Sequence, residues 1–283
     1  MSAGASLNLN GKIFRSGKLL ISTDNRSFRY GDGCFETIKI LRGKILLQAY
    51  HFERLFSSLA LLQFQLPGFF TPAFLQQQIL ALAKLNGHEK LGRVRLTLFR
   101  GDGGLYDVAN HSPNYCIQTW QLNPANNQLN ENGLVADIFT DARKVADTFS
   151  SVKSNNYLSY AMAALWAKKN KLNDAILLNP FNQLADATIA NIFIVKDGIV
   201  QTPALTEGPV NGTMRRYLLN CLREHNIPVA EKAISVDELE QASEIFLTNA
   251  IYGIRWVKQL GKINYQNQLA ALFHRDFIQP MFG

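Results

Sequence analysis

One loop of the chain reads Ser150-Ser151-Val152-Lys153-Ser154-Asn155-Asn156-Tyr157, and a helix is expected directly after it, at residues 157–170. A lysine amine that attacks a carbonyl carbon must be deprotonated near neutral pH, which requires partial burial or cationic neighbours. A lysine in a polar loop is usually exposed to solvent. Lys153 therefore points to a fold and a function only together with the residues around it.

The second half of the chain, around this loop, alternates between strand-like and helical patterns. The patterns predict strands at residues 134–140, 175–178, 191–195, 199–202 and 245–248, and a helix at 213–224 in addition to the one at 157–170. Lys196-Asp197-Gly198 is typical of a hairpin turn. This order of elements favours an α/β lobe.

The first half has a similar mixture of elements. Asn10-Gly11 and Arg42-Gly43 predict hairpin turns. Helices are expected at residues 51–62 and 72–85, and strands at 93–98 and 115–120. Residues 122–132, which are rich in Asn and Gln, are predicted to link an N-terminal α/β lobe, residues 1–121, to a C-terminal lobe, residues 133–283.

Composition limits the class of protein. The 283 residues are 47% apolar and 18% charged, which suits two folded lobes, and the formal net charge is +7. Because the basic residues are scattered rather than clustered, a nucleic-acid partner is not expected, and an anionic small substrate would account for the charge equally well. No apolar run is long enough for a membrane helix, and the N-terminus lacks an apolar signal region. The three cysteines form no CxxC pair, so neither a disulfide framework nor a metal site is expected, and we expect a cytoplasmic protein.

Three further stretches are candidates for chemistry, each with a simpler alternative. Val210-Asn211-Gly212-Thr213-Met214-Arg215 opens a helix whose first N–H groups could bind an anion, or it is an ordinary helix start. Arg54, in His51-Phe52-Glu53-Arg54, could clamp a phosphate or lie on the surface. Asp186 is either a turn residue or a buried partner for a cation. The sequence contains neither GxSxG nor HExxH, which argues against a serine hydrolase and a zinc hydrolase. Gly101-Asp102-Gly103-Gly104 does not match GxGxxG, which argues against a Rossmann dinucleotide site.

The order of the motifs resembles the class IV aminotransferases, the fold type IV enzymes that depend on pyridoxal 5′-phosphate (PLP). The resemblance runs in register through nearly the whole chain. It rests on 24–26 (Asp-Asn-Arg), 30–37 (Tyr-Gly-Asp-Gly-Cys-Phe-Glu-Thr), 51–55 (His-Phe-Glu-Arg-Leu), 100–101 (Arg-Gly), 153–157 (Lys-Ser-Asn-Asn-Tyr), 190–193 (Ala-Asn-Ile-Phe), 212–215 (Gly-Thr-Met-Arg) and 248–250 (Thr-Asn-Ala). It implies a two-lobe α/β fold like that of D-amino acid aminotransferase, with a smaller N-terminal lobe and a barrel-like sheet in the larger C-terminal lobe.

The resemblance also implies roles for individual residues. Lys153 would join PLP as a Schiff base and act as general base. The cofactor phosphate would be bound by Arg54, by the N–H groups of Thr213 and Met214, and by Asn249 and Ala250. Asp186 stands where the family usually has Glu against the pyridine nitrogen. It keeps the negative charge but is one methylene shorter, so either its strand moves inward or a water intervenes.

Within the family, three stretches are most similar to 4-amino-4-deoxychorismate lyase of folate biosynthesis, namely Arg100-Gly101-Asp102-Gly103-Gly104, Val210–Arg215 and Thr248-Asn249-Ala250-Ile251. Leu105 stands where the lyase has an Arg, and the Arg-x-His pair of D-amino acid aminotransferases is also absent. Thr37, Tyr106 and Asn249 are expected on the substrate side. A branched-chain or D-amino acid aminotransferase using the same lysine is the alternative, and a non-catalytic binding protein that kept the fold is a third. The resemblance implies a homodimer.

Overall fold

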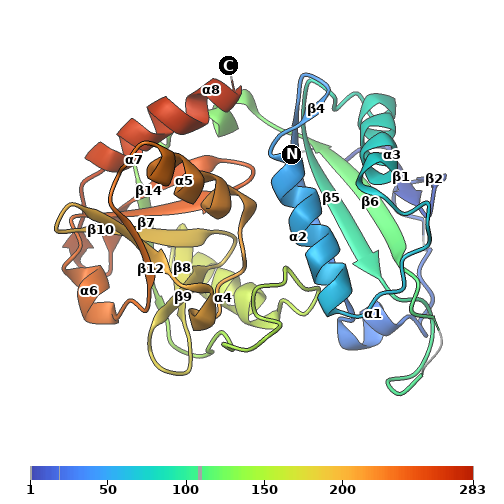
Figure 1. Ribbon diagram of the computed structural model, residues 1–283, viewed down its shortest axis with the longest axis horizontal. Helices are drawn as coiled ribbons and strands as arrows, with labels where there is room; N and C mark the ends of the chain where they lie inside the picture. The colour runs from blue at the N-terminus through green and yellow to red at the C-terminus, as the bar shows by residue number, and fades with distance from the viewer. Residues whose placement is uncertain (1, 19, 108–109, 283) are drawn as a thin grey trace. The chain divides into compact units, whose positions relative to one another are not determined.

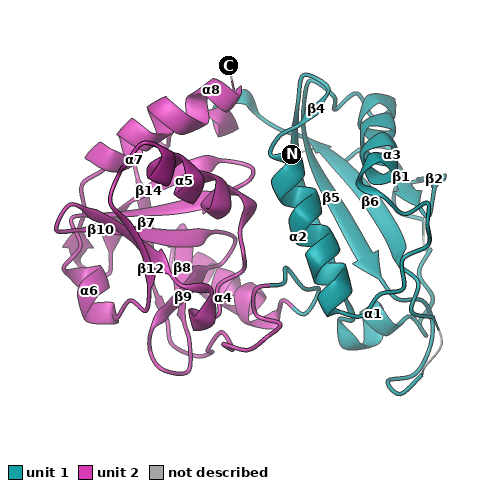
Figure 2. Ribbon diagram, viewed as in Figure 1, with its two compact units in different colours: residues 1–125, 152–156 teal, residues 126–151, 157–283 magenta. Residues whose placement is uncertain are grey.

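A computed structural model describes residues 2–18, 20–107 and 110–282. Two compact units make up the chain, as Figure 2 shows: unit 1 is Met1–Ala125 with Val152–Asn156, and unit 2 is Asn126–Ser151 with Tyr157–Gly283. The expected linker, residues 122–132, spans the division at residue 125. The segment Val152–Asn156 packs with unit 1, although it lies within the range 133–283 that we expected for the C-terminal lobe.

Unit 1 is an antiparallel sheet with helices on one face (Figure 1). The strand order is β2-β1-β6-β5-β3-β4. The strands are β1 Ser6–Leu9, β2 Lys12–Arg15, β3 Gly33–Leu41, β4 Lys44–Ile45, β5 Leu91–Phe99 and β6 Asn114–Gln121, and the helices are α1 Arg26–Tyr30, α2 Gln48–Leu61 and α3 Pro72–Leu85. A short 3₁₀ turn, Pro124–Asn127, follows.

The sequence of unit 1 explains which face of the sheet the helices cover. Alternation along β3 places Ile38 and Ile40 on one face, where they pack with Leu55 and Leu59 of α2 and Ile79 of α3. All five side chains are fully buried or nearly so. Residues 35, 37 and 39 of β3 therefore lie on the opposite face, away from α2 and α3.

Unit 2 is built on a mixed sheet with the order β12-β11-β10-β13-β14-β7-β8-β9, and β15 pairs with β14. Its strands are β7 Leu134–Phe139, β8 Asp174–Leu178, β9 Leu184–Ala187, β10 Asn191–Lys196, β11 Ile199–Pro203, β12 Val229–Lys232, β13 Glu244–Asn249, β14 Gly253–Leu260 and β15 Ile263–Asn264. Its helices are α4 Leu158–Lys169, α5 Thr213–Glu224, α6 Val236–Glu240, α7 Gln268–Phe273 and α8 Gln279–Phe282, with a 3₁₀ turn η2 Leu205–Glu207 and a π-helical turn η3 His274–Ile278. Because β9 at one end of the sheet also contacts β10 and β11, the sheet curls toward a barrel, as expected.

Several elements begin and end where the sequence predicted, and others do not. The helices at 72–85 and 213–224 are α3 and α5. Helix α2 begins at Gln48, three residues before the predicted start, because its first turn is outside the apolar stripe. Strand β14 was not predicted. Its buried residues Ile254, Val257 and Leu260 recur every third position, and a register shift after Val257 breaks the two-residue alternation of a strand.

Helix α4 is apolar on two sides. Tyr160, Ala163 and Ala167 are buried in unit 2, whereas the exposed fractions of Leu158, Met162 and Leu165 are 68%, 42% and 58%. These three residues recur at i, i+4 and i+7, so they share one face of the helix. Among the described residues, no helix is both long and apolar enough to cross a membrane.

Candidate active site

The segment that carries Lys153 is hydrogen-bonded to the start of β3. Phe35 N donates to the Lys153 carbonyl at 2.9 Å, and Asn155 N donates to the Gly33 carbonyl at 2.9 Å. Lys153 is half-buried, and its Nζ lies 4.8 Å from the centroid of the Phe35 ring. The lysine is therefore fixed to the sheet of unit 1 and does not lie in a fully exposed loop.

Gly33 makes this close approach possible. A Cβ at this position would lie 2.2 Å from the Leu98 carbonyl oxygen and 2.6 Å from Asn155 Nδ2. Asn155 Nδ2 also donates to Ser27 Oγ at 3.0 Å, which ties the lysine segment to α1. A side chain at residue 33 would therefore displace either β5 or the lysine segment.

Glu36, the next inward-facing residue of β3, forms a buried ion pair with α2. Arg54 Nε and Nη2 donate to its two carboxylate oxygens at 2.8 and 2.6 Å. His51 Nδ1 lies 2.6 Å from Glu36 Oε2, one helical turn before Arg54. All three side chains are almost completely buried. Glu36 and His51 both lie within the motifs that resemble the family, but no role was predicted for either.

The electrostatics of this group favour a carboxylate and a neutral imidazole. Burial by itself would raise the pKa of Glu36, but the charge of Arg54 and the hydrogen bonds from His51 and Arg54 outweigh it and lower that pKa to about 2. Burial is the largest cause that lowers the pKa of His51; Glu36 opposes it, Arg54 and Lys153 lower it further, and the net shift is downward. A neutral His51 that donates from Nδ1 to Glu36 helps to hold Arg54 in a fixed orientation.

The face of the same sheet that points away from α2 and α3 carries cations. The Arg95 guanidinium stacks on the Phe35 ring at 3.7 Å, and Thr37 lies directly opposite Arg95 across β3 and β5. Lys39 lies opposite Arg93 two pairs further along, on the same face of the sheet. The Lys39 side chain is fully buried, and this burial lowers its pKa to about 7. Arg95 and Lys153 thus contact the same aromatic ring.

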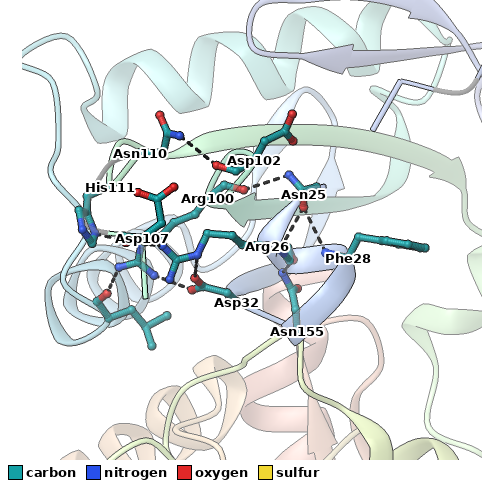
Figure 3. Close-up of polar contacts among 12 residues, drawn as sticks. Asn25, Arg26, Phe28, Asp32, Arg100, Asp102, Asp107, Asn110, His111 and Asn155 are labelled. Atoms are coloured by element: carbon teal, nitrogen blue, oxygen red, sulfur yellow. Dashed lines mark hydrogen bonds and ion pairs between the residues drawn. The ribbon is translucent and has the colours of Figure 1, made fainter. Parts of the chain in front are cut away.

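Arg100, the start of the Arg-Gly motif, is held within unit 1. Figure 3 shows Arg26 and Arg100 converging on Asp32, with an Arg26 Nε–Asp32 distance of 3.1 Å and an Arg100 Nη1–Asp32 distance of 2.5 Å. Arg100 also donates to the Leu62 carbonyl and to His111 Nδ1. Through these contacts Arg100 holds the start of the loop that follows it. Tyr106 on that loop is 93% exposed, so it is not packed against the part of the chain that the structure describes.

In unit 2, Asp186 is a buried acid with three donors. Oδ1 accepts from Asn191 Nδ2 at 2.7 Å, and Oδ2 accepts from Tyr160 Oη at 2.9 Å and from Val210 N at 2.8 Å. Asp186 lies in strand β9 and is 2% exposed. It is therefore the buried acid of the two alternatives that the sequence left open, and not a solvent-facing turn residue.

Helix α5 begins beside this acid. Its N-cap, Gly212, provides no side-chain hydrogen bond, so the first-turn N–H groups, including those of Thr213 and Met214, lack a side-chain cap. A Cβ on Gly212 would lie 1.8 Å from Asn191 Oδ1. Glycine thus lets Asn191 join the helix start to Asp186, since Asn191 Nδ2 also donates to the Val210 carbonyl at 2.8 Å.

Asn249 closes the turn after β13. Its Oδ1 accepts from Ile251 N at 3.0 Å and from Tyr252 N at 2.9 Å, and its Nδ2 donates to the Ile189 carbonyl at 3.4 Å. Ala250, inside this turn, is half-buried. The side chain of Asn249 therefore shapes the backbone around Ala250.

Two signals in the sequence point to residues that we missed. Glu36 alternates with Ile38 and Ile40, and a charged residue on a buried strand face requires a partner of opposite charge. Tyr160 shares a helix face with Ala163 and Ala167, and a buried tyrosine hydroxyl requires an acceptor. Neither signal names the partner, because each partner is distant in the sequence.

Comparisons with known proteins agree with this geometry. A model of the amino-transferase class IV family matches residues 33–260. A putative branched-chain-amino-acid aminotransferase of Methanocaldococcus jannaschii is 29% identical, covering 85% of this chain and 82% of its own. An aminodeoxychorismate lyase of Vibrio harveyi is 28% identical, covering 81% and 83%. The crystal structure of a branched-chain aminotransferase from Thermoproteus uzoniensis has a TM-score of 0.86 at 23% identity, covering 98% and 96%.

The family model covers most of the chain, and the structural match confirms the expected two-lobe α/β fold. The non-catalytic alternative is thereby set aside, because the relatives are named as enzymes. The chain belongs to the class IV aminotransferase family and is an enzyme whose cofactor is PLP.

Proposed function

We propose that the protein is a 4-amino-4-deoxychorismate lyase, which releases pyruvate and leaves 4-aminobenzoate for folate biosynthesis. Support comes from the stretches Arg100–Gly104, Val210–Arg215 and Thr248–Ile251 and from the lyase of V. harveyi. The match of these three stretches carries the proposal, and the structure adds that Lys153 and Arg95 contact one ring, that of Phe35. This arrangement sets an amine beside a guanidinium that can bind a carboxylate, and the lyase substrate has two carboxylates.

The residues present fit the chemistry of PLP. Lys153 would hold the aldehyde carbon covalently. The phosphate suits the uncapped start of α5 at Thr213 and Met214 and the turn at Asn249 and Ala250. Arg54 carries a planar guanidinium whose hydrogen bonds to Glu36 fix its orientation, and a guanidinium held in this way suits an anion such as the phosphate. The buried carboxylate of Asp186 suits a protonated ring nitrogen.

The residues around the cofactor would divide the work of the reaction. Bound PLP supplies an electron sink for the carbon that bears the substrate nitrogen. Lys153, once released, would take the proton from that carbon as general base. Asp186 would keep the ring nitrogen protonated through its negative charge. Arg54 would hold the phosphate end in place, with its own orientation fixed by Glu36.

The carboxylates of a substrate suit the face of the unit 1 sheet that points away from α2 and α3. Arg95 and Arg93 supply guanidinium groups there. The Thr37 hydroxyl, opposite Arg95, would donate a hydrogen bond to the same carboxylate. We retain Tyr106 and Asn249 as proposed substrate-side residues.

An aminotransferase of the branched-chain or D-amino acid type is the second candidate. The M. jannaschii relative bears that name for branched-chain substrates. A guanidinium beside the reactive lysine would equally bind the carboxylate of an amino acid. The same lysine would serve both reactions.

The two candidates differ in their need for a second substrate. Purified holoenzyme is incubated with aminodeoxychorismate without any keto acid, and pyruvate is measured through lactate dehydrogenase. The lyase releases one pyruvate for each 4-aminobenzoate formed, and Lys153→Ala abolishes both products. Product formation that requires a keto acid would establish the aminotransferase instead.

We also propose that the enzyme is a homodimer. The family resemblance implies this, and the exposed face of α4 formed by Leu158, Met162 and Leu165 supports it. Large apolar side chains grouped on one helix face are costly to leave in water and commonly mark a protein interface. We place the second copy of the chain on this face.

A further inference from the structure

Tyr160 is a buried residue to which the mechanism above gives no role. It is 4% exposed, and its ring stacks on that of Tyr157 with centroids 4.2 Å apart and planes 16° apart. Its hydroxyl donates to Asp186 Oδ2 at 2.9 Å. Burial, followed by the nearby charge of Asp186, raises the pKa of Tyr160 well above its usual value, so the hydroxyl remains a proton donor.

The three donors restrict how Asp186 can meet a further partner. A carboxylate oxygen offers about two acceptor positions. Tyr160 and Val210 N occupy both positions on Oδ2, whereas Asn191 takes one on Oδ1. The Tyr160 hydroxyl is therefore one of the donors that fix how the Asp186 carboxylate is turned.

Lys144 is a positively charged group that attracts the Asp186 carboxylate. Burial lowers the pKa of Lys144, and the charges of Asp186 and Asp147 oppose that shift, so the amine lies within electrostatic reach of Asp186. Its Nζ donates to the Ser150 carbonyl at 3.1 Å. Without the Tyr160 hydroxyl, Asn191 and Val210 would still hold the carboxylate, and the charge of Lys144 would attract it.

We propose that Tyr160 is a positioning residue of the cofactor site, whose hydroxyl fixes the orientation of the Asp186 carboxylate toward the pyridine nitrogen. The inference rests on the proposed role of Asp186 but not on the choice between lyase and aminotransferase. Tyr160 acts from α4, the helix that follows the Lys153 segment, whereas Asn191 and Val210 act from the side of α5. The acid is thereby held from two directions.

The test compares Tyr160→Phe with Tyr265→Phe, each of which removes one buried hydroxyl from unit 2. Tyr265 donates to the Leu239 carbonyl at 3.2 Å and is 7% exposed. The first readout is the rate at which the holoenzyme loses PLP on dilution. We expect Tyr160→Phe to lose it about tenfold faster, as for the loss of one hydrogen bond to a charged group, and Tyr265→Phe to match the wild type.

The second readout is the pH at which the visible absorption band of the holoenzyme titrates. A weaker hold on the ring-nitrogen proton removes positive charge from the cofactor, so the midpoint in Tyr160→Phe rises. Asp186→Asn should show both effects, and the double variant should show no more than Asp186→Asn alone because both residues act through one carboxylate.

Equal PLP loss and an equal midpoint in Tyr160→Phe and Tyr265→Phe would overturn the inference while Asp186→Asn still shows the role of the acid. No effect of Asp186→Asn would overturn the assigned role of Asp186 and the inference with it. Additive effects in the double variant would also overturn it. Pyruvate release by the wild type tests the lyase proposal separately from all three outcomes.

Discussion

At the scale of single residues, the ion pair between Glu36 and Arg54 determines the direction in which the Arg54 guanidinium points. Both side chains are almost completely buried, and His51 adds a third contact. A buried pair of charges is weak evidence for net stability, but removing one partner leaves the other charge unpaired. Glu36 therefore matters chiefly because Arg54 must point in one direction.

The variant Glu36→Gln tests this role. We expect its free energy of unfolding to fall by about 3–5 kcal/mol at pH 7, since Arg54 loses its counterion in a buried site. Because the folded-state pKa of Glu36 is lowered to about 2, its contribution is present above the unfolded value of about 4.3 and declines as pH falls toward 2. The difference between variant and wild type should therefore shrink over that interval in urea denaturation.

Glu53→Gln is the matched control, because Glu53 lies on the same helix with an exposed side chain. It should change stability by less than about 0.5 kcal/mol at any of these pH values. If Glu36→Gln behaves like this control, the ion pair does not have the role assigned to it here.

At the scale of elements, the start of β3 and the segment 152–156 are hydrogen-bonded to each other and together position Lys153. Gly33→Ala should disrupt it, because the added Cβ meets the Leu98 carbonyl and Asn155 Nδ2. We expect faster hydrogen exchange at the Asn155 amide, which donates to the Gly33 carbonyl, and slower uptake of PLP. Gly68→Ala, where nothing lies within 4 Å of the new Cβ, should leave both unchanged. Wild-type exchange at Asn155 in Gly33→Ala would refute the proposed contact.

The elements also show what the sequence could and could not predict. Helix α3 was predictable because Thr71 caps it, Pro72 occupies its first turn and Asn86-Gly87 ends it. Strand β14 was not, because its bulge gives buried residues a three-residue spacing. Motif order alone predicts Lys153, Arg54 and Asp186 as site residues, and these assignments stay predictions. Their partners Glu36, Tyr160 and Asn191 follow from contacts that only the fold creates.

At the scale of the whole molecule, the exposed face of α4 predicts association. Leu165→Lys places a charge within the apolar face, so sedimentation should show a monomer where the wild type is a dimer. Lys168→Glu, an exposed change on the last turn of the same helix, should leave the dimer intact. A wild type that sediments as a monomer would contradict the dimer, and a dimeric Leu165→Lys would contradict the chosen face.

The account as a whole depends on Lys153 being the lysine that bears PLP. Two other lysines are plausible competitors, because burial lowers the pKa of Lys39 to about 7 and also lowers that of Lys144. The direct measurement is borohydride reduction of the holoenzyme, followed by proteolysis and mass spectrometry of the peptides. The account predicts a phosphopyridoxyl group on Lys153 alone. The same group on Lys39 or Lys144, or on no lysine, would contradict it.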